Sequence, residues 1–169
     1  FINQIADLCE KSGADVHDMA KSMGLDKRIG DKFLHPGPGF GGSCFPKDNL
    51  ELAATARALG SPIGLIEEVI SFNKSRKKKM ARKIILACGN NVKGKKIAIL
   101  GLTFKPNTDD MRDSPSLDII PALQKAGAKI QAYDPEGMDQ AKSYLHGIKW
   151  CNNPYEALDG AEALVFLTE

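Results

Sequence analysis

Long apolar segments are missing from this sequence, and its charges nearly cancel. No stretch of the 169 residues is long and apolar enough to cross a bilayer. The first residues have neither the basic flank nor the small-residue cleavage site of a signal peptide. A formal net charge of +2 is too small to indicate binding to nucleic acid or to a membrane by itself. We therefore expect a cytoplasmic protein with no nucleic-acid and no membrane partner.

Cysteine is also scarce, and its spacing excludes two classes of site. The four cysteines form no CxxC pair and no Cys/His spacing typical of zinc, so we expect reduced thiols and no metal. We interpret Cys9, Cys88 and Cys151 as small buried hydrophobic residues. Cys44 differs from them in its surroundings.

The first half of the sequence predicts helices. Residues 1–12 should end at Gly13, and a second helix should run from Asp15 to Met23. Pro46 suits the first turn of a helix reaching Gly60. The pair Ser61-Pro62 predicts the start of a long helix to about Cys88. We interpret its basic run, residues 74–79, as a solvated face and not as a nucleic-acid site.

The second half predicts alternating strands and helices. Strand candidates are residues 96–100, 129–133, 148–150 and 163–168, with helices near 115–126, 137–145 and 154–159. Such alternation predicts an α/β fold with a Rossmann-like parallel sheet. We place a helical central domain at residues 1–90 and the Rossmann-like domain at residues 91–169. Because the chain opens inside a helix and stops after a strand, we expect both ends to be cut.

The most informative segment is GPGFGGSCFPKD, residues 37–48. Its glycines allow the backbone to approach a ligand closely. Cys44 stands at the exit of this loop, where the start of a helix and the neighbouring Lys47 favour a thiolate. Asp48 lies four residues further on, where it could act as a base or position water. Together these features indicate covalent chemistry on a polar substrate.

The same segment resembles the catalytic signature of the UDP-glucose/GDP-mannose dehydrogenase family. The segment 24–30 upstream and residues 101–106, 109, 112, 114–115 and 133–135 downstream continue the resemblance, which covers essentially the whole chain. Members of this family oxidise the C6 hydroxyl of a nucleotide sugar to a carboxylate with two NAD⁺. The resemblance therefore implies an NAD-dependent dehydrogenase and a homodimer or higher assembly through the long helix.

The resemblance also implies roles for individual residues. Cys44 matches the nucleophile that forms the thiohemiacetal and thioester, and Asp48 matches the carboxylate that activates water. Lys47 and Arg112 match positions near the cofactor. The implied substrate-binding residues are Arg28, Phe33, Leu34, His35, Gly39, Phe40, Gly41, Gly42 and Lys105. No GxGxxG fingerprint follows a predicted strand, so we expect NAD to bind in a domain upstream of Phe1 and the second domain to hold the nucleotide sugar. We expect the isolated chain to be inactive.

Several alternatives stay open. Within the family, UDP-glucose is favoured, GDP-mannose remains possible, and Ser43 argues against N-acetylated amino sugars, whose enzymes often place histidine before the cysteine. A cysteine hydrolase would pair Cys44 with His35 and an orienting third group. A non-catalytic module for nucleotide-sugar binding or dimerisation would leave Cys44 without a chemical role. Dependence on NAD⁺ would separate the dehydrogenase from the hydrolase, and a Cys44→Ser change that left full-length activity untouched would favour the module.

Overall fold

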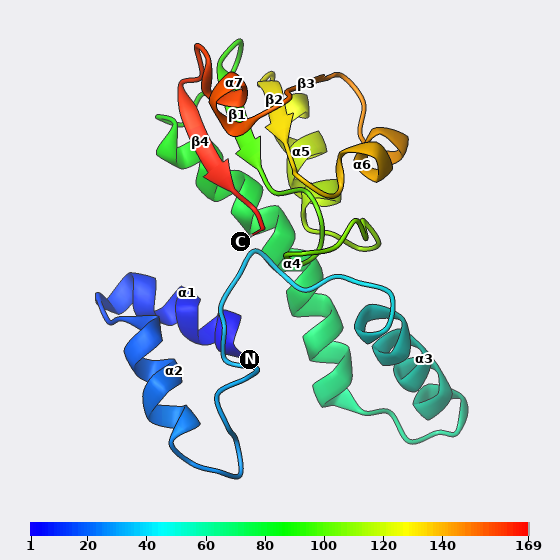
Figure 1. Ribbon diagram of the computed structural model, residues 1–169. Coiled ribbons are helices and arrows are strands. Elements are labelled where there is room, and N and C mark those ends of the chain that lie inside the picture. The colour runs from blue at the N-terminus through cyan, green and yellow to red at the C-terminus, as the bar shows by residue number, and fades with distance from the viewer. Residues whose placement is uncertain (169) are drawn as a thin grey trace. The chain divides into compact units, whose positions relative to one another are not determined.

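The computed structural model describes residues 1–168, and the chain divides into two compact units, Phe1–Gly39 and Phe40–Glu169 (Figure 1). The fold class is α/β, with helices in the first half of the chain and a parallel sheet in the second. The proposed domain boundary between residues 90 and 91 stays a prediction.

The first unit contains helices α1, Ile2–Ser12, and α2, Val16–Gly24. Both helices match the predicted segments. Gly13 follows α1, and its N–H donates to the carbonyl of Cys9. The Asp15 carboxylate caps α2 by accepting from the N–H of His17 at 2.7 Å. The structure differs from the prediction only in placing Gly24 inside α2.

The second unit begins with helices α3, Phe45–Ala58, and α4, Gly64–Ala87. Pro46 lies in the first turn of α3, as predicted. The predicted start of α4 at Ser61-Pro62 is wrong, because Ser61 donates its N–H back to Ala56 and completes the end of α3. Although α4 has 24 residues, no helix within residues 1–168 is long and apolar enough to span a membrane.

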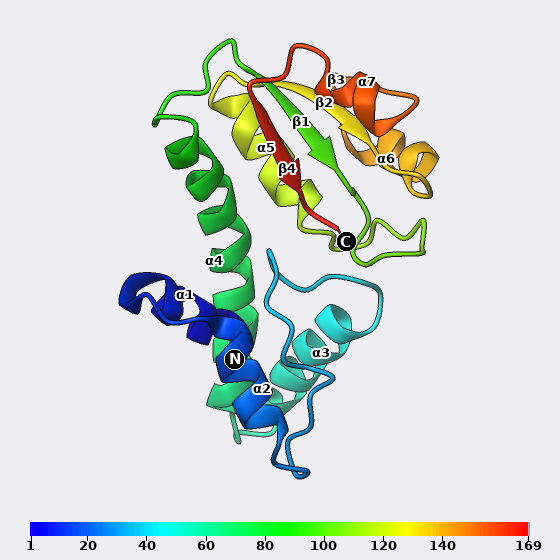
Figure 2. The same cartoon turned by 60° about the vertical axis from the view of Figure 1, so that its left-hand side comes forward.

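Four parallel strands follow, in the order β3-β2-β1-β4 (Figure 2). They are β1, Lys96–Leu100; β2, Lys129–Tyr133; β3, Ile148–Trp150; and β4, Ala163–Phe166. The connecting helices are α5, Ser116–Lys125; α6, Met138–Tyr144; and α7, Pro154–Leu158. The prediction of a Rossmann-like parallel sheet is confirmed.

The main core lies on one face of this sheet, where α5, α6 and the C-terminal part of α4 pack. Ile97 and Ile99 of β1 and Ile119, Ile120 and Leu123 of α5 are fully buried there. The opposite face is covered by α7, where Ala157 packs with Ala98 and Cys151. Because both faces of β1 are buried, its sequence is a continuous apolar run and not an alternating one.

The basic run of α4 corrects one prediction. Lys74, Lys78 and Lys79 are exposed, as a solvated face requires. Arg76 and Lys77 are instead buried, with 4% and 5% of their surfaces exposed. Lys77 reaches the carbonyl of Asp113 at 2.9 Å and the carboxylate of Asp118 at 3.2 Å. A buried ammonium requires such partners. They could not be identified from the sequence, because they lie more than 35 residues away from Lys77.

Candidate functional site

The cysteine loop ends at the N-terminus of α3, and Cys44 is the residue that precedes the helix. Its thiol is exposed, with Ser43 Oγ at 3.6 Å from Sγ. The carbonyl of Cys44 accepts the first helical hydrogen bond, from Asp48 N–H at 2.8 Å. The free N–H groups of a helix start carry a partial positive charge, which stabilises an anion formed there. The fold thus presents the Cys44 thiol to solvent at the positive end of a helix.

Two cations lie close to this thiol, each paired with a carboxylate. Lys47 Nζ contacts Asp48 Oδ1 at 2.5 Å, and Arg112 binds Asp110 through Nε and Nη2, both at 2.9 Å. The hydrogen bond to Asp48 raises the pKa of Lys47, and the charge of Cys44 adds to that rise. The hydrogen bond to Asp110 likewise raises the pKa of Arg112, with a smaller contribution from Cys44. Both side chains therefore remain positive near the thiol over the working pH range.

Gly41 and Gly42, the two residues before Ser43, leave no room for a Cβ atom. A Cβ atom on Gly41 would lie 2.3 Å from the carbonyl oxygen of Asp113. A Cβ on Gly42 would lie 2.7 Å from the ring of Phe104, and the φ of Gly42 is +92°. The N–H of Gly42 donates to the carbonyl of Arg112 at 2.7 Å. The loop is therefore seated on the segment between β1 and α5.

The start of the same loop is bound to α4 through Asn73. The amide of Asn73 accepts from the N–H of Phe40 and donates to the carbonyl of Phe40, both at 2.9 Å. The ring of Phe40 lies edge-on to that of Phe45, with centroids 4.8 Å apart. Residues on both sides of Cys44 are thus held by packing and hydrogen bonds, while the thiol itself is free to react.

A cavity of about 850 Å³ opens next to the loop. Its walls come from α3, from the N-terminal half of α4 and from the segment after β1, and they include Gly42, Ser43, Lys47, Arg57, Glu67, Ile70, Arg112 and Asp113. Lys47 and Arg112, the predicted cofactor contacts, therefore line the same cavity. Charged and apolar side chains both line this cavity. Such a lining suits a ligand that has a polar or anionic part and an apolar part.

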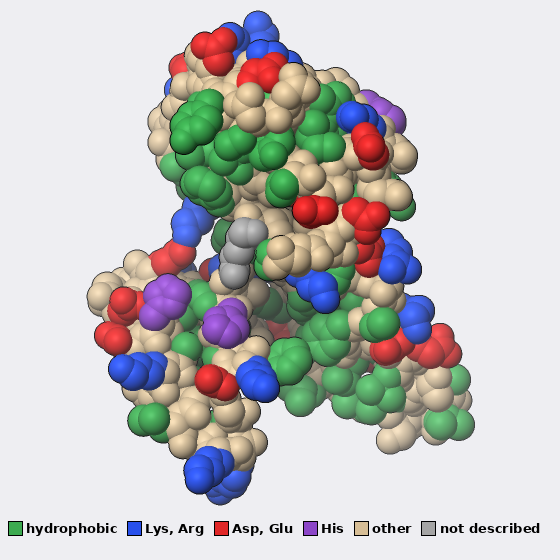
Figure 3. Space-filling view, viewed as in Figure 1, with side chains coloured by type: hydrophobic (Ala, Val, Ile, Leu, Met, Phe, Trp, Pro, Cys, Tyr) green, Lys and Arg blue, Asp and Glu red, His purple; other side chains and the backbone are tan. Residues whose placement is uncertain are grey.

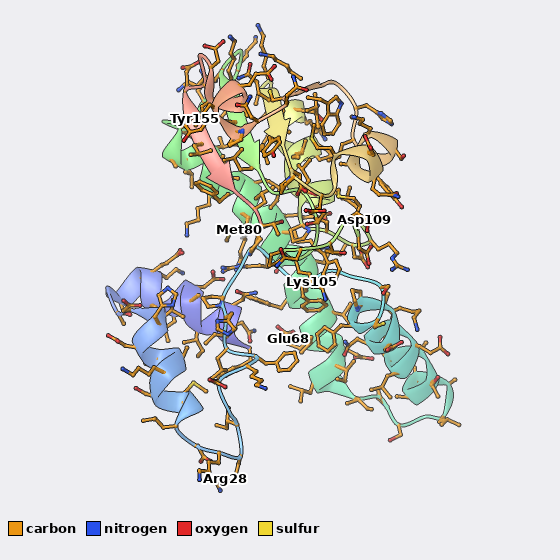
Figure 4. The ribbon with its side chains drawn as sticks, viewed as in Figure 1. Arg28, Glu68, Met80, Lys105, Asp109 and Tyr155 are labelled. Atoms are coloured by element: carbon orange, nitrogen blue, oxygen red, sulfur yellow. The ribbon has the colours of Figure 1, made fainter. Side chains whose placement is uncertain are left out.

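Lys105 comes from the segment between β1 and α5 (Figure 4). Its ammonium lies 5.2 Å from the centroid of the Phe104 ring, the ring that packs against Gly42. The structure therefore brings the predicted substrate lysine, the predicted cofactor arginine Arg112 and the cysteine loop together through one segment. This segment follows β1 at the carboxyl edge of the sheet, which is where ligands bind in parallel α/β folds.

Five predicted substrate residues lie in the other compact unit, Phe1–Gly39. Arg28 is exposed in the segment after α2 and pairs with Asp26 (Figure 4). Phe33 is 94% exposed and His35 is exposed, whereas Leu34 is buried. Gly39 is the last residue of the unit. Their roles in binding remain predictions.

The turn after β1 differs from a dinucleotide-binding turn. The buried carboxylate of Asp134, at the end of β2, accepts the N–H groups of Leu102, Thr103, Glu136 and Gly137 at 2.6, 3.4, 2.9 and 2.6 Å. A pyrophosphate at this turn would need the N–H groups that Asp134 already uses. An acidic residue near this position usually binds a ribose in dinucleotide folds, but here it joins two loops. The observation agrees with the absence of a GxGxxG fingerprint after β1.

Asn73 and Lys77 were missed among the residues that shape the site. A signal was present in the sequence, because both residues stand on the apolar stripe of α4 between Ile70 and Met80. A polar residue on a buried stripe needs a partner, which makes it a candidate for a specific contact. The partners themselves could not be found from the sequence. Among residues 1–168, no group of three or more His, Cys, Asp or Glu residues is placed to hold a metal ion.

Comparisons with known proteins agree with this architecture. Residues 1–75 match the family model "UDP-glucose/GDP-mannose dehydrogenase family, central domain", and residues 98–169 match the UDP binding domain of the same family. UDP-glucose 6-dehydrogenase of Rhizobium meliloti is 57% identical over the whole chain, which covers 39% of that relative. UDP-glucose 6-dehydrogenase TuaD of Bacillus subtilis is 46% identical over the whole chain, which covers 37% of it.

A solved structure gives the same result. The chain superimposes on a UDP-glucose dehydrogenase from the archaeon Pyrobaculum islandicum with a TM-score of 0.92 at 32% identity, covering 99% of this chain and 39% of that one. The chain thus spans about 39% of the length of these relatives. With both family models matched in order and the fold reproduced, the chain belongs to the UDP-glucose/GDP-mannose dehydrogenase family.

Proposed function

We propose that this chain supplies the catalytic loop and the nucleotide-sugar-binding domain of an NAD-dependent UDP-glucose 6-dehydrogenase, which oxidises UDP-glucose to UDP-glucuronate. The observation that carries the proposal is the exposed Cys44 thiol at the start of α3, beside Lys47, Asp48 and Arg112. The relatives named above are UDP-glucose dehydrogenases, and this supports UDP-glucose over GDP-mannose as the substrate.

The chemistry assigns Cys44 to the second half of the reaction. The C6 alcohol is first oxidised to an aldehyde. Cys44 Sγ then adds to the aldehyde carbon, which forms a C–S bond and places a negative charge on the aldehyde oxygen. After a second oxidation at that carbon the product is a thioester, and water attacks it, breaks the C–S bond and releases the carboxylate and the thiolate. A thiolate suits both steps, because it is a strong nucleophile and a good leaving group.

Asp48 is the group proposed to activate the water. Its carboxylate is exposed and lies one helical turn from Cys44, with its N–H bonded to the Cys44 carbonyl. The carboxylate forms an ion pair with Lys47, and a carboxylate is one of the groups that serve as a general base. The protein therefore provides the nucleophile and the base from one turn of one helix.

We propose that this chain supplies only a small part of the NAD⁺ site. NAD⁺ would accept a hydride in each oxidation, and Lys47 and Arg112 on the wall of the cavity are the residues here that would contact it. Their positive charges suit a pyrophosphate. The turn after β1 does not suit a dinucleotide, since Asp134 occupies its N–H groups. We therefore propose that most of the cofactor site lies outside these residues.

A homodimer is the proposed assembly. Several large apolar side chains of α3 and of the start of α4 are exposed: Leu50, Leu52, Leu59, Ile63 and Leu65. Figure 3 shows apolar side chains gathered over this part of the molecule. Surfaces of this kind often mark interfaces between proteins. Light scattering on the parent protein should give at least twice the monomer mass, and a monomer at micromolar concentration would refute the assembly.

The test of the function is the NADH yield of the full-length parent protein. UDP-glucose, GDP-mannose and UDP-N-acetylmannosamine are supplied separately with excess NAD⁺. The proposal expects about two NADH per UDP-glucose and little from the other sugars, because one alcohol becomes one carboxylate in two hydride transfers. Folded parent protein that binds NAD⁺ but yields no NADH from any sugar would refute it. The matched variant Cys44→Ser should lose carboxylate production while it still binds UDP-glucose.

A further inference from the structure

Two polar side chains on α4 are buried although the proposed chemistry assigns them no step. Asn73 is 9% exposed and Lys77 is 5% exposed, and they lie one helical turn apart on the same face. Burying polar groups is unfavourable unless hydrogen bonds compensate. Both side chains direct their hydrogen bonds at backbone groups of the cysteine loop or of the segment on which that loop rests.

Asn73 holds the beginning of the loop. Its amide oxygen accepts the N–H of Phe40 at 2.9 Å, and its amide nitrogen donates to the carbonyl of Phe40 at 2.9 Å. Two bonds to one residue fix the direction of the backbone as well as its distance from α4. The Phe40 ring then contacts the ring of Phe45, which follows Cys44 directly. The contact therefore extends from α4 to the residue next to the nucleophile.

Lys77 holds the other side of the loop. Its ammonium donates to the carbonyl of Asp113 at 2.9 Å, and the adjacent carbonyl of Arg112 accepts the N–H of Gly42 at 2.7 Å. Gly41 also lies against Asp113, with no room for a Cβ atom. One helix thus supports both ends of the glycine segment that precedes Cys44.

On the basis of the proposed function, we propose that Asn73 is a positioning residue for Cys44. Asn73 is not among the residues that line the cavity, and it acts by holding Phe40 and so the path of the chain up to the thiol. Its effect falls on the capture of the aldehyde, the step in which Sγ forms a bond to carbon. A displaced thiol adds to the aldehyde less often, and the uncaptured aldehyde then leaves the enzyme. Small displacements of reacting groups are known to cost large factors in rate.

The experiment measures how the full-length parent protein divides its product between aldehyde and carboxylate. Variant Asn73→Leu removes both hydrogen bonds at nearly constant size. Variant Asn73→Asp keeps an oxygen for the Phe40 N–H but places its second oxygen against the Phe40 carbonyl. Control Lys74→Ala changes the next residue of α4, whose side chain is exposed. Control Ile119→Val weakens the core at a fully buried position of α5, away from the loop.

The readouts are NADH per UDP-glucose, released aldehyde trapped with hydroxylamine, kcat and KM. We expect Asn73→Leu to lower kcat about tenfold or more, to leave KM within about threefold, and to reduce the yield from two NADH per sugar towards one with trapped aldehyde. Asn73→Asp should fall between Asn73→Leu and the wild type. Both controls should keep two NADH per sugar, including Ile119→Val at a temperature well below its lowered Tm. Hydrogen exchange of the Phe40 amide should be faster in Asn73→Leu than in either control.

Two results would overturn the positioning role. One is full yield and unchanged kcat in Asn73→Leu although the Phe40 amide exchanges faster. The other is aldehyde release by Ile119→Val as large as by Asn73→Leu, which would show a general loss of stability. A failure of the proposed function is separate, because it would appear as no NADH from the wild type with any sugar, or as an unchanged NADH yield in Cys44→Ser. If Asn73→Leu does not fold, the division of product in Asn73→Asp decides the question alone.

Discussion

Replacing Gly41 by alanine should destabilise the protein, whereas the same replacement at Gly37 should not. The two glycines belong to the same loop, and neither has a positive φ. A Cβ atom on Gly41 would lie 2.3 Å from the carbonyl oxygen of Asp113 and 2.7 Å from its carbonyl carbon. A Cβ on Gly37 would meet no atom within 4 Å. The pair therefore isolates the steric contact from the change in chain entropy that both substitutions share.

The expected magnitude follows from the nature of the obstructing atoms. They belong to the backbone, so a change of rotamer cannot relieve the contact, and the loop must move away from residue 113. Overpacking of this kind costs about 1–3 kcal/mol, and we expect Gly41→Ala to lie in the upper half of that range. For a chain of this length, 1 kcal/mol lowers Tm by about 2–4 °C, so the fall should be about 4–12 °C. Gly37→Ala should change the free energy of unfolding by no more than about 0.5 kcal/mol.

The assay is thermal unfolding of the two variants and the wild type, followed by circular dichroism at one protein concentration. Hydrogen exchange of the Gly42 amide provides a local readout, because its bond to the Arg112 carbonyl at 2.7 Å should weaken when the loop moves. Equal Tm values for Gly41→Ala and Gly37→Ala, within about 1 °C, would refute the reasoning. The loop would then be separated from Asp113 in solution.

Three further predictions concern groups outside the loop glycines. Alkylation by iodoacetamide, followed by mass spectrometry, should modify the exposed Cys44 well before the buried Cys151, and the reverse order would contradict the placement of both thiols. Burial raises the pKa of the Cys151 thiol from its ordinary value of 9.0, so the native state binds its proton more tightly than the unfolded state does. The resulting stabilisation is present below about pH 9 and is lost as the pH rises through the native pKa. Above about pH 9, Tm should therefore fall more steeply with pH in the wild type than in Cys151→Ala. Parallel plots of Tm against pH for the two proteins would exclude the effect. Lys77→Met should lower the free energy of unfolding by about 1–3 kcal/mol in urea titrations, since it leaves the Asp113 carbonyl and the Asp118 carboxylate without their cation. Lys78→Met, at an exposed position, is the control. Equal free energies of unfolding for the two variants would refute the buried contact.

Sequence patterns predicted the secondary structure well because the signals are local. The cap at Asp15, the proline in the first turn of α3 and the apolar run of β1 each depend on a few neighbouring residues. The start of α4 was misplaced because Ser61 is used by the preceding helix, to which it donates its N–H. Two local signals competed there, and only the folded chain shows which of them is used.

The residues of the candidate site also fall into two groups, one close together in the sequence and one far apart. Cys44, Lys47 and Asp48 lie within one helical turn, so their proximity follows from the sequence once a helix start is predicted. Lys105 and Arg112 are more than 60 residues away in sequence, and only the resemblance to a family associated them with the cysteine. The structure connects both to the loop through Phe104 and through the Gly42 hydrogen bond.

What the sequence determined by itself is the class of fold, the family and the cysteine proposed as the nucleophile, because periodicity, helix caps and a contiguous motif are all encoded in neighbouring residues. The tertiary structure alone decided that Asn73 and Lys77 are buried, that Asn73 bonds the backbone of the cysteine loop, and that Lys77 bonds the backbone of the segment on which this loop rests. Each of these contacts joins residues more than 30 positions apart. Burial and partnership at such separations depend on how α4 packs, and packing is a property of the whole chain and not of any segment.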